Sequence, residues 1–237
     1  KDSICAFIHR VDPDIIDMQE VLHHQLEVLK TGLPEYTVVG VGREDGKTAG
    51  EYAPIFFKQA KYTLLDQNTF WLCEKPDSVG MVGWDAALTR IATWVKLQDK
   101  KTGQILMVVN THFDHIGTEA RRNSALLIIE KIKEIVGTSP AILTGDFNVS
   151  EDWDAYKTIT NNEFILKDAH KVAGKRTGVD FTYHNFGKIP AEKCEKIDFI
   201  FVTPQIRVIS SYIPFSQLND TLFLSDHNPE IVELEIK

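Results

Sequence analysis

Short apolar runs and amphipathic stretches alternate along the chain and predict a protein made mostly of β-strands with a few helices. Four to eight apolar residues between turn residues are typical of a strand, whereas apolar residues three and four positions apart are typical of a helix. The predicted strands cover residues 14–20, 36–41, 51–58, 62–72, 90–97, 105–110, 141–145, 197–202, 208–212 and 231–236. The predicted helices cover residues 3–11, 21–29, 118–136 and 152–160. This succession favours a core of two sheets covered by outer helices.

The most regular helical pattern is that of residues 118–136. Its apolar stripe consists of Ala125, Leu126, Ile129, Ile132 and Ile135 or Val136. Its polar face, which we expect to meet water, consists of Glu119, Arg121, Lys131, Lys133 and Glu134. We expect the core, rather than a stacking platform, to hold Trp71, Trp84 and Trp94. The surface is expected to hold His9, His23, His24 and His170.

Composition changes this picture mainly through charge. The 237 residues fit a single domain over 1–237. No apolar run reaches the length of about 18 residues that a membrane-spanning helix needs. The formal net charge of −8 argues against tight, non-specific binding to nucleic acid. A local basic patch and a solvated loop are both open interpretations of Lys171, Lys175, Arg176 and Lys188.

The three cysteines, Cys5, Cys73 and Cys194, lie far apart and form no CxxC pair. They suggest neither a disulfide framework nor a zinc site, and reduced thiols are favoured over a single disulfide.

The predicted strand at residues 141–145 is followed by polar residues that would not be buried in an apolar core. The apolar run 141–143 requires burial, and Gly145 allows the backbone to turn. Asp146 and Asn148, two positions apart, project from the strand end on the same side. A carboxylate and an amide at the rim of a sheet can hold a hard metal ion or a water nucleophile.

Four other apolar runs end or begin in polar residues in the same way. These polar segments are Gln19–Glu20, Asn110–Thr111–His112, Lys196–Ile197–Asp198 and Ser225–Asp226–His227. If the strands lie side by side, their ends meet at one edge. A cluster of Glu, Asp, Asn and His at such an edge is typical of metal-assisted hydrolases.

Charge assigns a first set of roles to these residues. We expect Glu20 and Asp226 to bind Mg²⁺, with Mn²⁺ as the other candidate, because hard cations prefer carboxylate oxygens. Asp146 is expected to position or deprotonate a water molecule, and Asn148 to donate to an anionic oxygen.

A phosphate group in this site also needs positive charge. The residues expected to provide it are His112, His227 and Arg90. Each histidine requires a carboxylate that fixes its tautomer, and Glu51 and Asp198 are the candidates.

Taken in order, the motifs resemble the endonuclease/exonuclease/phosphatase superfamily. They are Gln19–Glu20, Asn110–Thr111–His112, Gly145–Asp146–Phe147–Asn148, Ile197–Asp198–Phe199–Ile200 and Ser225–Asp226–His227. Residues 50–57, 69–72 and 83–90 further resemble a bacterial branch of it. The superfamily includes pancreatic deoxyribonuclease, abasic-site endonucleases, neutral sphingomyelinases, inositol polyphosphate 5-phosphatases and CCR4-type deadenylases. The resemblance covers essentially the whole chain.

This resemblance implies an α/β (α+β) fold, a four-layer sandwich of two mixed β-sheets flanked by helices, as in deoxyribonuclease I. It matches Glu20 to the metal-binding glutamate and Asp226 to an aspartate near the metal. It matches Asp146 and Asn148 to the pair that orients water and phosphate. It also matches His227 to the catalytic histidine with Asp198 as its partner, His112 to the second histidine with Glu51 behind it, and Arg90 to a phosphate-contacting arginine.

Two features depart from the family pattern. The family begins with a strand that carries an asparagine at the site, and residues 1–237 supply no such strand, so we expect one domain without its leading strand in this sequence. Asn228 stands where an apolar residue is expected and could alter access to the site.

Asp114 and His115, just past His112, either touch substrate or shape a loop.

The sequence therefore predicts a Mg²⁺-dependent phosphoesterase that hydrolyses a phosphodiester, in the manner of a nuclease, by attack of a water that Asp146 aligns. One alternative is a phosphatase or phospholipase C-type hydrolase acting on a small phosphomonoester or lipid headgroup. A second is a non-catalytic binding protein on the same fold. We expect a monomer with a phosphate-ester substrate, nucleic acid being one candidate.

Overall fold

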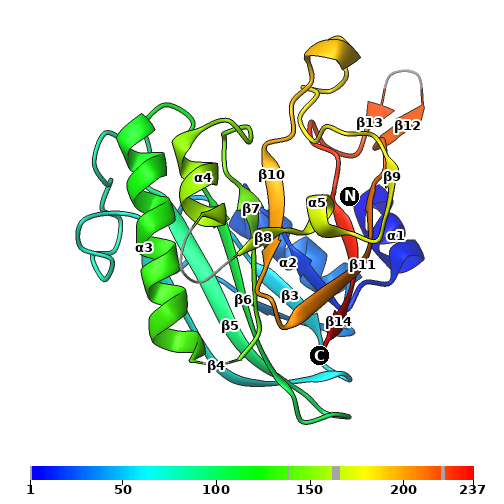
Figure 1. The fold of residues 1–237 in the computed structure, drawn as a ribbon, viewed down its shortest axis with the longest axis horizontal. Coiled ribbons are helices and arrows are strands. Elements are labelled where there is room, and N and C mark those ends of the chain that lie inside the picture. The colour runs from blue at the N-terminus through cyan, green and yellow to red at the C-terminus, as the bar shows by residue number, and fades with distance from the viewer. Residues whose placement is uncertain (1, 138, 162–165, 220–221) are drawn as a thin grey trace.

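The computed structural model describes residues 2–137, 139–161, 166–219 and 222–237, and at its centre lies a six-stranded mixed sheet (Figure 1). Across the sheet the strands are β4 (Tyr62–Trp71), β5 (Ile91–Asp99), β6 (Ile105–His112), β7 (Ala141–Asp146), β10 (Asp198–Val202) and β8 (Lys167–Asp168). Neighbours pair antiparallel, except that β6 and β7 run parallel. Helix α3 (Thr118–Val136) joins this parallel pair, because a parallel connection must cross over the sheet.

The register of the central strands sets polar residues side by side. His112 at the end of β6 lies opposite Asp146 at the end of β7. Asp146 in turn lies opposite Asp198, the first residue of β10. Residues opposite one another on neighbouring strands project to the same face, so these three side chains share one face and one edge of the sheet.

One face of the central sheet is covered by α3 and by α4 (Asp154–Thr160). The side chains that α3 buries include Ala125, Ile128, Ile129, Ile132 and Val136. Two expectations for this helix are corrected. Leu126 is exposed and Ile128 takes its place in the core, and Arg121 is buried rather than facing water.

The other face packs against two three-stranded sheets. The first has the order β1 (Ile15–Asp17), β3 (Ile55–Lys58) and β2 (Tyr36–Val39), and the second β14 (Ile231–Ile236), β11 (Ile206–Ile213) and β9 (Lys175–Gly178). Helices α1 (Asp2–Val11) and α2 (His23–Gly32) contribute Ile8, Leu26 and Leu29 to a cluster on the outer side of the first sheet. The layers are therefore helices, sheet, sheets and helices.

The mixed α/β architecture with outer helices is confirmed, with one change. The second sheet forms as two separate three-stranded sheets among the described residues. Six short elements were not predicted: β8, β9, α5 (Ala169–Val172), the 3-10 helix η1 (Ala191–Lys193), β12 (Gln217–Asn219) and β13 (Leu222–Phe223). Elements of two to four residues carry no periodicity that a sequence pattern can reveal.

Most single-residue expectations outside the site agree with the structure. Trp71 and Trp94 are buried, Trp84 packs partly buried against the core, and the three cysteines are free. The expectation that His170 lies on the surface is wrong, because the side chain is buried with Nδ1 2.8 Å from Ser211 Oγ. None of the described helices is both long enough and apolar enough to cross a membrane.

Asp17, at the end of β1, is a buried carboxyl group between the sheets. Thr144 Oγ1 donates a hydrogen bond of 2.8 Å to Asp17 Oδ2, and Oδ1 has no partner among the described residues. Burial raises the pKa of Asp17 to about 7.

Replacing Asp17 with asparagine should therefore flatten the pH dependence of stability. Because the folded-state pKa lies above the unfolded one, the neutral carboxyl group stabilises the wild type fully below about pH 4. This contribution is lost, at roughly 1 kcal/mol per pH unit, as the pH rises toward neutrality. Urea unfolding at pH 5, 6 and 7 should show the free-energy difference moving in favour of Asp17→Asn. Parallel profiles would contradict this, and the exposed Asp66→Asn serves as the matched control.

Candidate active site

The turn after β7 places Asp146 and Asn148 at the centre of the site. Gly145 is required there, because a Cβ at this position would lie 2.3 Å from the Thr111 carbonyl oxygen. Asp146 Oδ1 accepts a 2.8 Å hydrogen bond from the backbone N–H of Asn148, whose φ of +50° is uncommon for a non-glycine residue. Asn148 Nδ2 donates to the Phe113 carbonyl at 3.0 Å, which fixes the amide beside the carboxylate.

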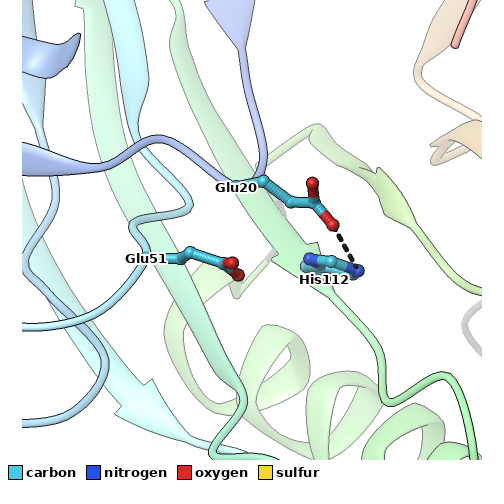
Figure 2. A group of neighbouring side chains, drawn as sticks. All are labelled: Glu20, Glu51 and His112. Atoms are coloured by element: carbon cyan, nitrogen blue, oxygen red, sulfur yellow. Dashed lines mark ion pairs between the residues drawn. The ribbon is translucent and has the colours of Figure 1, made fainter. Parts of the chain in front are cut away.

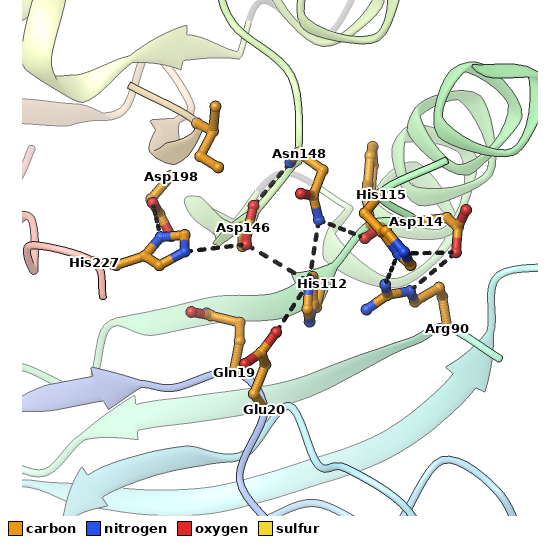
Figure 3. Close-up of polar contacts among 12 residues, drawn as sticks. Gln19, Glu20, Arg90, His112, Asp114, His115, Asp146, Asn148, Asp198 and His227 are labelled. Atoms are coloured by element: carbon orange, nitrogen blue, oxygen red, sulfur yellow. Dashed lines mark hydrogen bonds and ion pairs between the residues drawn. The ribbon is translucent and has the colours of Figure 1, made fainter. Parts of the chain in front are cut away.

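His227 and Asp198 form a hydrogen-bonded pair next to Asp146 (Figure 3). The distance from His227 Nδ1 to Asp198 Oδ2 is 2.7 Å, and His227 Nε2 lies 3.9 Å from Asp146 Oδ2. Burial disfavours the charged imidazole, but the hydrogen bond and charge of Asp198 outweigh it and raise the pKa of His227 to about 9. His227 is therefore an imidazolium at neutral pH.

The second histidine, His112, has the opposite protonation. Burial first, and then the charges of Arg90 and Arg43, hold the pKa of His112 well below its usual range. Its Nε2 lies 3.1 Å from Asn148 Nδ2 and 3.6 Å from Asp146 Oδ2. The expectation that His112 supplies positive charge is corrected, because its surroundings keep the ring neutral.

Glu20, Glu51 and His112 form a second group whose potential ligand atoms all lie within 4.8 Å of one another (Figure 2). Glu20 follows β1 with a left-handed φ of +59°, and its Oε1 lies 3.9 Å from His112 Nε2. Burial, and then the negative charges of Glu51 and Asp226, raise the pKa of Glu20. Such backbone strain together with like charges is typical of functional sites.

Glu51 is held by a different partner from the one the sequence suggested. Its Oε2 accepts a 2.5 Å charged hydrogen bond from Arg43 Nη1. No hydrogen bond joins Glu51 to His112 among the described contacts, although the two side chains face one another (Figure 2). Glu51 thus lies beside His112 at the pocket wall, not behind it as a hydrogen-bonding partner.

Arg90 is buried and lines the same pocket. Its Nε lies 3.4 Å from Asp114 Oδ1 and its Nη2 lies 3.1 Å from His115 Nδ1, while Nη1 has no partner among the described residues. Asp114 accepts hydrogen bonds from the backbone N–H groups of Ala87, Ile116 and Gly117. Asp114 therefore shapes the loop, and His115 lines the pocket.

These groups surround a pocket of about 320 Å³ (Figure 3). Of the residues named from the sequence, it is lined by Glu20, Glu51, Arg90, His112, Asp146, Asn148, Asp226 and His227, and Asp198 lies behind His227. Leu88, Tyr183 and Ile197 also line it and were not predicted as site residues. The Tyr183 ring lies 4.9 Å from that of His227 through an antiparallel bridge between two distant segments, a pairing without a local sequence signal.

Asn228, the unusual residue after His227, lies outside the pocket. Its side-chain Oδ1 accepts from the Ser216 backbone N–H at 2.8 Å, and its backbone N–H donates to the Thr182 carbonyl. The side chain is buried and ties two loops together, so it does not control access to the site.

Comparison with known proteins gives consistent results. The family model described as "Endonuclease/Exonuclease/phosphatase family" matches residues 1–227. A crystal structure of an endonuclease/exonuclease/phosphatase from Bacteroides vulgatus is 63% identical, with a TM-score of 0.97, and covers 100% of this chain and 90% of that one. A mannosyl-6-phosphatase from Bacteroides thetaiotaomicron is 37% identical, with a TM-score of 0.92, over 99% of this chain and 90% of that one.

More distant proteins share the same architecture. An uncharacterised protein, L388, of Acanthamoeba polyphaga mimivirus is 28% identical over 99% of this chain and 91% of its own length. The human nocturnin catalytic domain, 17% identical with a TM-score of 0.78, shows the shared fold. The deoxyribonuclease I-like fold implied by the sequence is confirmed, and the chain belongs to the endonuclease/exonuclease/phosphatase family.

Proposed function

We propose that this protein is a divalent-metal-dependent phosphatase that hydrolyses a small phosphate monoester. The main support for this proposal is a single pocket of about 320 Å³ whose lining combines carboxylates with cationic side chains. These residues are Glu20, Asp226, Asp146, His227 and Arg90. Members of this family hydrolyse phosphoesters. A pocket of this size lies at the small end of ligand sites, which span about 300–1,000 Å³.

A monoester is favoured over the phosphodiester that the sequence alone suggested. The pocket is small and Leu88 and Tyr183 form part of its lining, and the chain carries a net charge of −8, which disfavours a polyanionic strand. The 37% identical mannosyl-6-phosphatase supports the same choice and makes a hexose phosphate the first substrate to test.

The residues at the mouth of the pocket fit a divalent cation. Burial raises the pKa of Glu20, and the negative charges of Glu51 and Asp226 raise it further; a cation relieves this repulsion. Glu20 and Asp226 would hold Mg²⁺ or Mn²⁺ through oxygen atoms, the ligands that these ions prefer. A metal bound there supplies positive charge that polarises a phosphoryl oxygen.

The remaining chemistry belongs to side chains of the chain itself. Burial and the nearby Asp198 charge raise the pKa of Asp146, which suits a group that accepts a proton from an attacking water. The His227 imidazolium and Arg90 Nη1, which has no partner in the part of the chain that the structure describes, stabilise the charge that develops on the phosphoryl oxygens. Neutral His112 and the Asn148 amide, which lie 3.1 Å apart, form the polar wall against which the phosphate is placed.

The test is a panel of initial rates with Mg²⁺, with Mn²⁺ and with EDTA. Phosphate release from mannose 6-phosphate should depend on the added metal and stop in EDTA. It should exceed cleavage of bis(p-nitrophenyl) phosphate, plasmid DNA, an oligoribonucleotide and sphingomyelin by about tenfold or more in kcat/KM. A higher value for DNA or RNA would support the nuclease-like alternative, and one for sphingomyelin the phospholipase C-type alternative. Absence of turnover on every compound would support the binding protein.

A further inference from the structure

A second pocket takes no part in the chemistry proposed above. It has a volume of about 300 Å³ and lies between the beginnings of α3 and α4. The residues of its lining that matter here are Glu119, Arg121, Arg122, Asp152, Trp153 and Asp154.

The two pockets share one stretch of backbone. Asn148 lines the first and the next residue, Val149, lines the second. They are linked again through Asp114, whose carboxylate faces Arg90 in the first pocket and whose carbonyl accepts a 3.0 Å hydrogen bond from Arg121 Nη1 in the second. A substrate with two connected parts can therefore occupy both pockets.

Trp153 lines the second pocket, and the guanidinium group of Arg121 packs against its ring. The Arg121 guanidinium carbon lies 5.0 Å from the centroid of the Trp153 ring. Arg121 is only 4% exposed, whereas Trp153 is 44% exposed. A tryptophan fixed in this way by a buried cation presents a rigid aromatic face on which the ring of a ligand can pack.

The charges around Trp153 nearly cancel. Three carboxylates, from Glu119, Asp152 and Asp154, face two guanidinium groups, and Arg122 Nη1 lies 3.6 Å from Glu119 Oε2. A polyanion meets repulsion from the carboxylates, and a simple cation meets the two arginines. A neutral ring with many hydroxyl groups fits best, because hydroxyls donate to carboxylates and accept from the exposed Arg122 guanidinium group while the C–H face of the ring packs on the indole.

We propose that this second pocket binds a sugar ring belonging to the same molecule whose phosphate occupies the first pocket. The inference rests on the proposed function, since it assigns the substrate class as a phosphorylated oligosaccharide rather than a free hexose phosphate. Trp153 is then a specificity-determining residue that contacts the non-phosphorylated ring.

Kinetics with two substrates test this directly. Wild-type protein should show a KM for a disaccharide 6-phosphate about tenfold lower than for the corresponding monosaccharide 6-phosphate. Trp153→Ala should raise the disaccharide KM to the monosaccharide value with kcat unchanged, and should leave the monosaccharide kinetics unaffected. Trp153→Phe should keep most of the preference. Tyr212→Ala, which removes an exposed aromatic ring on β11, outside both pockets, should behave as the wild type.

A binding measurement separates this inference from the proposed function. The non-phosphorylated disaccharide, titrated by calorimetry in the presence of EDTA, should bind wild type and not Trp153→Ala. Binding without any phosphatase activity would overturn the proposed function and keep the sugar site. Turnover of the disaccharide phosphate with no effect of Trp153→Ala, or preferential binding of tetramethylammonium, would overturn the sugar site and keep the function.

Discussion

Replacing Asp146 with asparagine should lower kcat on a phosphate monoester by about 10²–10⁴-fold, the range expected for a lost general base. Asparagine keeps the shape of the side chain but cannot accept the proton of an attacking water. The carboxyl group is buried 3.6 Å from His112 Nε2 and 3.9 Å from His227 Nε2, and burial together with the Asp198 charge raises its pKa. Because a buried carboxylate is costly, the variant should unfold at or above the wild-type temperature.

The measurement is single-turnover and steady-state kinetics at saturating Mg²⁺, with thermal unfolding followed in parallel. Asp66→Asn, an exposed aspartate on β4, is the matched control and should retain wild-type kcat. Asp146→Asn with wild-type kcat would show that another group activates the water, and the assigned role would be wrong.

The second large effect is expected at His227. His227→Gln should lower kcat by about 10²–10³-fold, because it removes an imidazolium aimed at the charge that develops in the transition state. The 2.7 Å hydrogen bond from His227 Nδ1 to Asp198 Oδ2 orients the ring and helps raise its pKa to about 9. Asp198→Asn should therefore reduce kcat in the same direction by loosening that orientation.

His24→Gln provides the control, since His24 is an exposed histidine outside the pocket. Circular dichroism should show the same fold for all three variants. A large rise in KM with unchanged kcat in His227→Gln would mean that the residue binds ground state and transition state equally, which contradicts the proposed role.

Sequence reasoning succeeded where the chemistry is local to a strand end. The Gly145, Asp146 and Asn148 pattern predicted a turn that presents two polar groups, and the structure shows that turn with the Asn148 N–H bonded to Asp146. Eight residues predicted from strand ends, from the charge that a phosphate requires and from the family resemblance line one pocket. The layered α/β architecture followed from the succession of strands and helices.

Contacts that depend on tertiary structure could not be predicted from the sequence pattern. Tyr183 reaches His227 through a bridge between two segments far apart in the sequence. The ion pair of Glu51 with Arg43 spans only 8 positions, but it forms in an irregular loop that has no periodic pattern. The burial of Arg121 beneath Trp153 could not be read from α3 alone, since its helical position belongs to the polar face. Protonation states also depend on surroundings, which is why His112 was expected to be charged and is held neutral.

The proposed function requires that Glu20, Asp226 and the strand-end residues hold a divalent cation against a phosphate group. The most direct measurement is anomalous diffraction from crystals soaked with Mn²⁺ and inorganic phosphate, for wild type and Glu20→Gln. The predicted result is a Mn²⁺ peak on the Glu20 and Asp226 carboxylates, with phosphate beside it near Arg90 and His227, and no Mn²⁺ peak in the variant. A peak elsewhere, or phosphate bound away from these residues, would contradict the account.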